Sequence, residues 1–95
     1  MTRPGQLVVG FAAETRDIET EALRKLRKKR LDAVIANDVS KPDRGMGADT
    51  NAVTIYTPSA PPLAFPLLPK PRLATRLVRW LETFASPVRA RPRKP

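Results

Sequence analysis

Residues 7–40 read LVVGFAAETRDIETEALRKLRKKRLDAVIANDVS and predict a strand, a helix and a second strand. The apolar run 7–13 is too short for a buried helix, and its valines favour a strand. A helical period follows over 17–29. A second apolar run at 33–36 then stops at an Asn-Asp pair, and the second strand is predicted over 32–36. Two short apolar strands joined by an amphipathic helix are typical of the βαβ unit of an open parallel sheet.

The helix predicted over 17–29 has an apolar face. Ile18, Ala22 and Leu26 recur every four residues and would cover the sheet. Acidic residues fall in its first turns and basic residues in its last turns, where the helix dipole favours each sign of charge.

Polar side chains can fix the ends of this helix. Thr15 or Asp17 can supply an N-cap. Glu21 and Lys25 are four residues apart, in the orientation that favours an ion pair. Residues 24–30 carry six basic side chains in seven positions and complement the dipole at the C-terminus of the helix.

The remainder of the chain predicts one further strand and one further helix. Glycine and proline make 41–48 a loop, whereas the alternation over 51–57 predicts a third strand. Five prolines make 58–69 an irregular connection rather than a hairpin. A helix is predicted over 70–85, and the proline-rich basic segment 86–95 is expected to be a disordered tail. The apolar stripe of the last helix consists of Leu73, Leu77, Leu81 and Phe84, with Trp80 beside it.

Composition narrows the possible functions. The 95 residues suffice for one small domain, and they include no Cys and no His, so thiolate and imidazole chemistry are excluded. No stretch approaches the ~20 apolar residues of a membrane span, and a cytoplasmic location is expected. The net charge is +9, from 18 Lys and Arg against 9 Asp and Glu, which favours anionic partners such as nucleotides or nucleic acid.

Three segments in order, VVGFAAET (8–15), LDAVIANDVS (31–40) and GMGADTNAV (45–53), give the chain a family resemblance. With the Lys-rich helix between the first two, the chain resembles the C-terminal part of phosphopantothenate–cysteine ligase over residues 7–84. The resemblance implies an α/β fold, a partial Rossmann-like parallel sheet of about three strands and two helices. Residues 1–85 would be the C-terminal portion of the ligase domain, followed by the tail.

The resemblance also implies a reaction and a set of ligand contacts. The family activates phosphopantothenate with CTP and Mg²⁺ as an acyl-cytidylate, which cysteine then attacks to give phosphopantothenoylcysteine. Phe11, Lys25 and Lys29 match the nucleotide-binding residues of the family, and Asn37 and Asp38 are possible further contacts. No catalytic residue, metal ligand or flavin site is expected in this segment. Family members pair as dimers, so a homodimer or pairing with the upstream half of the enzyme is expected.

Each of these residues also has a purely structural interpretation. An aromatic residue in a strand, such as Phe11, usually belongs to the core, and basic residues in the last turns of a helix are usually solvated. Lys29 lies roughly 18 Å along the helix from its first residue, too far to reach a phosphate at the helix N-terminus. Asn37 and Asp38 follow a strand, where both residue types form turns. The sequence leaves these alternatives open.

Motifs that the family places before VVGFAAET are absent from the chain. These are the Asn that handles the acyl intermediate, a Lys-x-Lys-Lys motif and an Asn-Pro-Asp-Ile motif. We therefore expect the chain to be catalytically inert alone and to act as part of a larger enzyme. The alternative is a small basic module that binds nucleic acid through residues 24–30 and the tail.

Overall fold

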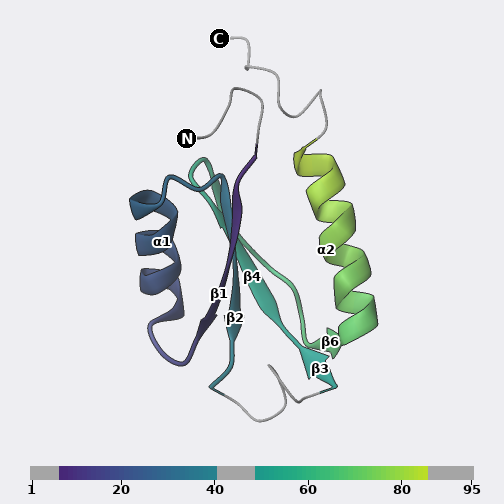
Figure 1. Ribbon diagram of the computed structural model, residues 1–95. Helices are drawn as coiled ribbons and strands as arrows, with labels where there is room; N and C mark the ends of the chain where they lie inside the picture. The colour runs from purple at the N-terminus through teal and green to yellow at the C-terminus, as the bar shows by residue number, and fades with distance from the viewer. Residues whose placement is uncertain (1–6, 41–48, 86–95) are drawn as a thin grey trace.

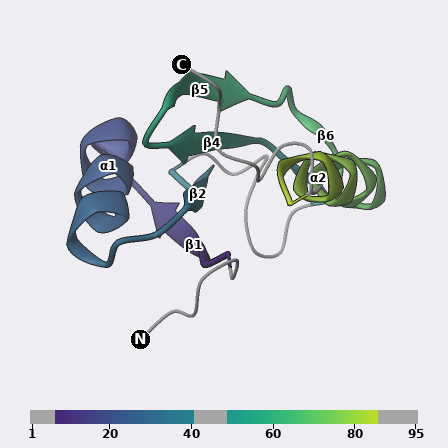
Figure 2. The same cartoon turned by 90° about the horizontal axis from the view of Figure 1, so that it is seen from above.

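A four-stranded sheet with one helix on each face forms the core of the protein (Figures 1 and 2). The computed structural model describes residues 7–40 and 49–85, so the predicted 41–48 loop and 86–95 tail lie outside the described residues. The helices are α1 (Ile18–Lys28) and α2 (Lys70–Phe84), and neither is long and apolar enough to cross a membrane. The strands are β1 (Val9–Glu14), β2 (Ala33–Asp38), β3 (Thr50–Asn51), β4 (Val53–Thr57), β5 (Ala60–Ala64) and β6 (Leu68–Pro69).

The strand order of the main sheet is β1-β2-β4-β5. The predicted βαβ unit is present, because β1 and β2 pair in parallel and α1 connects them, with Phe11 opposite Ile35. The α/β fold is confirmed, but the main sheet has four strands and is mixed, since β4 and β5 both pair antiparallel. The β4–β5 turn explains part of this result, because two residues between Thr57 and Ala60 can join only antiparallel strands.

The prediction for 58–69 was wrong. This segment forms β5, which completes a hairpin with β4, and then β6, which pairs with β3 in a separate two-stranded sheet. Pro61 and Pro62 are accommodated because β5 is an edge strand, where a missing backbone N–H costs little. The strand predicted over 51–57 is divided at Ala52 between β3 and β4.

The face of the sheet under α1 carries a core of small and aliphatic side chains. The predicted apolar face of α1 is confirmed, because Ala22 and Leu26 are buried in this core and Ile18 packs against it. The strands contribute Ala12, Val34, Ala36 and Tyr56. Gly10 allows the chain after the helix to approach β1 closely, since a Cβ there would lie 2.7 Å from Cδ1 of Leu31.

The two ends of α1 are closed by backbone geometry. Asp17 is the N-cap residue, but its φ is 51° and its side chain makes no capping hydrogen bond, so the predicted side-chain cap is not formed. At the C-terminus Arg30 has φ 53°, and Leu31 N–H donates to the Leu26 carbonyl at 3.0 Å. With the Arg30 N–H bonded to the Arg27 carbonyl at 3.2 Å, this is a Schellman motif with arginine where glycine is usual.

The opposite face of the sheet packs against α2. Leu73 is buried against Ile35, Val53, Ile55 and Phe65. Leu77 and Phe84 of the predicted stripe pack against the same cluster, as does Trp80 beside it, and the ring centroids of Trp80 and Phe84 lie 4.6 Å apart in a stacked pair. Val53 and Ile55 therefore face α2 while Tyr56 faces α1, as the alternation over 51–57 predicts.

Candidate functional site

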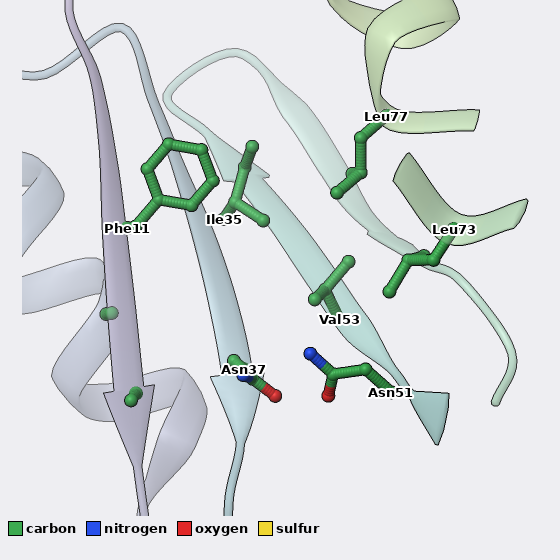
Figure 3. A pocket seen from close by; sticks show the side chains of 9 residues that line it. Phe11, Ile35, Asn37, Asn51, Val53, Leu73 and Leu77 are labelled. Atoms are coloured by element: carbon green, nitrogen blue, oxygen red, sulfur yellow. The ribbon is translucent and has the colours of Figure 1, made fainter. Parts of the chain in front are cut away.

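A pocket of about 310 Å³ lies between α2 and the carboxyl half of β1 and β2 (Figure 3). Four aliphatic side chains line it, Ile35 and Val53 from the sheet and Leu73 and Leu77 from α2. Ligands of open α/β sheets collect at the carboxyl ends of parallel strands, and binding pockets are mostly apolar with a few polar groups. The position and lining of this pocket fit both rules.

Two asparagines supply the polar groups of the pocket, and Figure 3 shows them at the same end of it. The Oδ1 atom of Asn37 is buried and has no hydrogen-bond partner within the part of the chain that the structure describes. The Oδ1 atom of Asn51 accepts a hydrogen bond from the Ala52 N–H at 2.9 Å, which fixes that side chain. A buried acceptor without a donor is costly, so a ligand N–H placed beside Asn37 would relieve an existing penalty.

Phe11 lies at the open side of this pocket. Phe11 is 73% exposed, although it lies in the middle of β1. Its side chain is on the face of the sheet that α2 covers at β2 and β4. The core interpretation of Phe11 was therefore wrong for this chain. Its ring is available to stack on a planar group.

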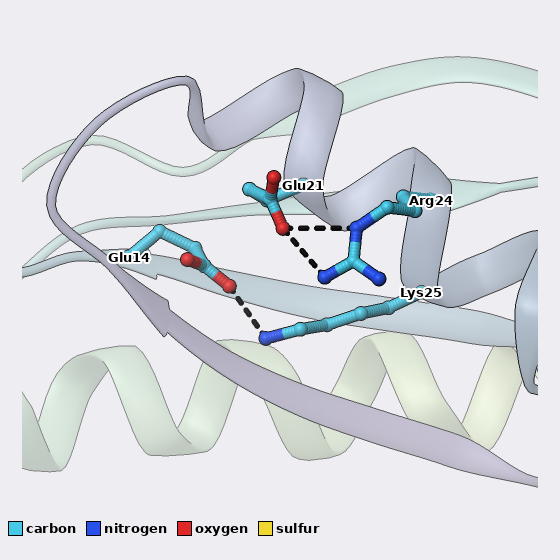
Figure 4. Close-up of polar contacts among 4 residues, drawn as sticks. All are labelled: Glu14, Glu21, Arg24 and Lys25. Atoms are coloured by element: carbon cyan, nitrogen blue, oxygen red, sulfur yellow. Dashed lines mark hydrogen bonds and ion pairs between the residues drawn. The ribbon is translucent and has the colours of Figure 1, made fainter.

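Lys25 is held at the carboxyl end of β1. Its Nζ lies 2.6 Å from Oε2 of Glu14, the last residue of β1, in a partly buried ion pair (Figure 4). The predicted pairing of Lys25 with Glu21 was wrong, since Glu21 binds Arg24 at 2.7 Å instead. Lys25 thus reaches the end of the sheet where the pocket lies, despite its place in the last turns of α1.

The predicted residues do not all come together. Lys29 is the exposed C-cap residue of α1. Asp38 lines a different pocket, of about 320 Å³, and its Oδ1 accepts hydrogen bonds from the Ser40 N–H and hydroxyl at 2.9 and 2.6 Å. That arrangement is a turn of the kind Asp commonly forms. Of the predicted residues, Phe11 and Asn37 line one pocket, whereas Lys25, Lys29 and Asp38 are not part of its lining.

The second pocket also contains Tyr56. Burial raises the pKa of the Tyr56 hydroxyl above its usual value of 10.0, and the negative charge of Glu19 raises it further. The phenol is therefore neutral at physiological pH and can donate a hydrogen bond.

Magnesium would need oxygen ligands, usually carboxylates together with substrate phosphates. Among residues 7–40 and 49–85, no group of three His, Cys, Asp or Glu side chains comes together.

Sequence reasoning missed several residues of the pocket. Asn51 lies in the GMGADTNAV segment but was not predicted as a site residue, and only its place in that segment could have suggested it. Leu73 and Leu77 were expected to pack on the sheet, and nothing in their pattern indicates that they also line a pocket.

Several known proteins with similar sequences carry the name coenzyme A biosynthesis bifunctional protein CoaBC. The chain is 43% identical over 84 residues to the coenzyme A biosynthesis bifunctional protein CoaBC of Vibrio vulnificus, covering 88% of the chain and 21% of that protein. It is 49% identical over 65 residues to the CoaBC protein of Bacillus subtilis, covering 68% of the chain and 16% of that protein. The chain thus spans about a fifth of the length of these relatives.

A solved structure agrees with these relatives. The crystal structure of the C-terminal domain of a coenzyme A biosynthesis bifunctional protein CoaBC is similar with a TM-score of 0.64 and 34% identity, covering 83% of this chain and 35% of that one. Neither the fold nor these relatives indicate a nucleic-acid-binding module. Residues 1–84 match the family described as the DNA/pantothenate metabolism flavoprotein C-terminal domain, and the chain belongs to that family.

Proposed function

We propose that this chain forms the C-terminal part of a CTP-dependent phosphopantothenate–cysteine ligase, with residues 1–85 as the ligase portion. The observation that carries the proposal is the family match over residues 1–84 together with a pocket at the carboxyl ends of β1 and β2. Its substrates would be CTP with Mg²⁺, phosphopantothenate and cysteine. A cytoplasmic location goes with this role, and the segment would bind no flavin.

In this proposal the nucleotide meets the chain at the carboxyl end of β1. The exposed ring of Phe11 would stack on the base, and the buried Oδ1 of Asn37 would accept a hydrogen bond from the ligand. Lys25 would bring positive charge to the same end of the sheet, because its ammonium group already reaches Glu14. A lysine acts on a phosphate as a point charge, so this contact needs no exact geometry.

The two sides of β1 set a condition on this binding mode. Glu14 lies on the same side of the strand as Ala12, which faces α1, whereas Phe11 faces the α2 side. A ligand that contacts both Phe11 and Lys25 must therefore pass around the end or the outer edge of β1. Lys29 would contribute only if the triphosphate extended farther along α1.

Catalysis would need groups from outside the chain. The pocket contains no titratable side chain, so the described residues can bind and orient the nucleotide but offer no general acid or base there. We propose that the chain alone is inert and that the upstream half of the same kind of enzyme, in a monomer or a homodimer, completes the site.

A chimeric enzyme tests this proposal without depending on association between separate fragments. Residues 1–84 of this chain would replace the matching stretch of the Vibrio vulnificus CoaBC protein, and CTP-dependent ligation of phosphopantothenate to cysteine would be measured. We expect activity in the chimera and none in the 95-residue chain. Phe11→Ala and Lys25→Met should each weaken CTP binding about tenfold, because each removes one nucleotide contact.

Lys28→Met is the matched control for Lys25→Met. Lys28 lies on the same helix, carries the same charge and is exposed, whereas the ion pair with Glu14 is made by Lys25. It should leave CTP binding unchanged. A folded chimera that fails to bind CTP would contradict the ligase assignment, and turnover by the chain alone would contradict its inertness.

A further inference from the structure

A groove of about 530 Å³ lies at the opposite end of the main sheet from the pocket that contains Phe11 and Asn37. Leu31, just before β2, borders it together with Thr57 and Pro58 at the end of β4. These residues meet because β2 and β4 are antiparallel, so that the start of one strand lies beside the end of the other. Figure 1 shows the end of α1 at this side of the molecule and the tip of β1 at the other. The proposed function makes no use of this groove.

The walls of the groove are mostly apolar. Leu23 and Leu26 of α1 line it together with Leu31 and Pro58. Leu26 is buried in the core, whereas Leu23 and Leu31 are only partly buried and Pro58 is exposed. The volume falls within the range of about 300–1,000 Å³ that is usual for ligand sites. Such a lining favours a ligand whose body is apolar.

Two arginines supply the charge of the groove. Arg27 and Arg30 both line it and both are exposed. Neither guanidinium forms an ion pair with a carboxylate of residues 7–40 or 49–85, and the ion pairs of α1 are made by Arg24 and Lys25 instead. Arg27 follows Lys25 by two residues, which places it about 200° around the helix. The basic run 24–30 therefore serves two different sides of α1.

Two unfavourable features of the chain occur at this groove. Arg30 has φ 53° at the end of α1, where glycine is usual, and strained residues of this kind cluster at ligand contacts. Glycine would relieve the strain but would leave one guanidinium fewer at the groove. The Oγ1 atom of Thr57, another lining residue, is buried without a hydrogen-bond partner in the described segments. Together these features are more typical of a binding site than of a solvated surface.

We infer that this groove binds a small amphipathic anion, with its apolar body against the leucines and its carboxylate or phosphate at Arg27 and Arg30. Guanidinium groups bind carboxylates and phosphates through paired N–H donors. The described lining contains no carboxylate and no side-chain amide, so it does not suit a cation or a polar body such as a sugar. This inference goes beyond the proposed function and does not depend on it, because the two sites lie at opposite ends of the sheet.

The test titrates the full 95-residue chain with octanoate below its micelle-forming concentration, followed by calorimetry and by NMR of the backbone amides. We expect saturable one-to-one binding that shifts the amides of Leu31 and Thr57 and leaves those of Phe11 and Asn37 unchanged. Octyl phosphate, which has the same body, should also bind. Octanol lacks the charge and acetate lacks the body, so each should bind at least tenfold more weakly than octanoate. The same titrations are repeated in the chimera, which keeps the test valid if the separate chain does not fold.

Two variants remove the charges one at a time. Arg27→Gln and Arg30→Gly should each weaken octanoate binding at least fivefold, because each removes one charged contact. Lys28→Gln is the matched control, since it removes the same charge from the same turn of α1 and Lys28 is not part of the lining. It should bind octanoate like the unaltered chain. Circular dichroism checks folding, and Arg30→Gly, which suits the backbone at that position, decides the question if Arg27→Gln does not fold.

Several results would overturn the inference. Unchanged octanoate binding by folded Arg30→Gly would show that the guanidinium is not a ligand contact, and acetate binding as tight as that of octanoate would indicate an adventitious ion only. Amide shifts confined to Phe11 and Asn37 would place the ligand in the other pocket. No saturable binding up to about 10 mM would mean that there is no such site. Binding to anionic lipid vesicles without binding of octanoate would make this surface a membrane contact instead.

Discussion

Replacing Asn37 with leucine should stabilise the free chain and weaken its binding of nucleotide. The Oδ1 atom of Asn37 is buried in an apolar pocket and receives no hydrogen bond from the described residues. Burying an unsatisfied acceptor costs about 1–3 kcal/mol, and an apolar side chain of similar shape avoids that cost. We expect a gain near the lower limit, about 1 kcal/mol, because the Asn37 residue as a whole is only half-buried.

Urea denaturation followed by circular dichroism measures the stability change. For a chain of this size, 1 kcal/mol corresponds to a shift of roughly 4–8 °C in the midpoint of thermal unfolding, which is easily resolved. In the chimera described above, loss of one acceptor worth about 1 kcal/mol should weaken CTP binding roughly fivefold. Calorimetric titration with CTP measures this second effect.

Thr57→Val is the matched control for this substitution. Thr57 Oγ1 is the other buried side-chain oxygen without a hydrogen-bond partner in the described segments, and it lies outside the pocket. It should stabilise the chain by a similar amount and leave CTP binding unchanged. The reasoning is refuted if Asn37→Leu destabilises the free chain by more than about 1 kcal/mol, or if it binds CTP as tightly as the unaltered chimera.

Three further predictions concern stability. Arg30→Gly should stabilise the chain by about 0.5–1 kcal/mol in urea denaturation, because Arg30 has φ 53° at the end of α1 and glycine adopts that conformation without strain. A loss of stability would show that the contacts of the arginine side chain outweigh the relief of backbone strain. Burial raises the pKa of Tyr56 in the folded state, so the unfolded state loses its phenolic proton first as pH rises. The contribution of this proton to folding stability is therefore present below about pH 10 and is lost above it. Between pH 9 and 11, Tyr56→Phe should lose less stability than the unaltered chain, and parallel curves of stability against pH for the two proteins would contradict this. Leu73→Ala should lower the free energy of unfolding by about 2–3 kcal/mol, near the low end for leucine, because one side of the residue borders a pocket. Val78→Ala on the exposed side of α2 should change it by less than about 0.5 kcal/mol. Equal losses of stability in the two variants would disprove the assigned packing of α2.

The sequence by itself determined the central strand–helix–strand unit and the family. The apolar runs at 7–13 and 33–36 and the four-residue period of Ile18, Ala22 and Leu26 are local patterns, and the structure places each as expected. The sequence could not determine the hairpin of β4 and β5. Proline disfavours a strand in general, and only the position of β5 at the edge of the sheet makes Pro61 and Pro62 tolerable.

The tertiary structure decided the properties of the pocket. The apolar runs around Phe11 and Ile35 are alike, but β1 is an edge strand whereas β2 has a neighbouring strand on each side. The ring of Phe11 is therefore exposed and the side chain of Ile35 is buried. Lys25 could pair with Glu21 by spacing alone, yet the packing of α1 on β1 brings Glu14 closer. Exposure, ion pairing and the unsatisfied oxygen of Asn37 all depend on which strands become neighbours, and local sequence does not specify that choice.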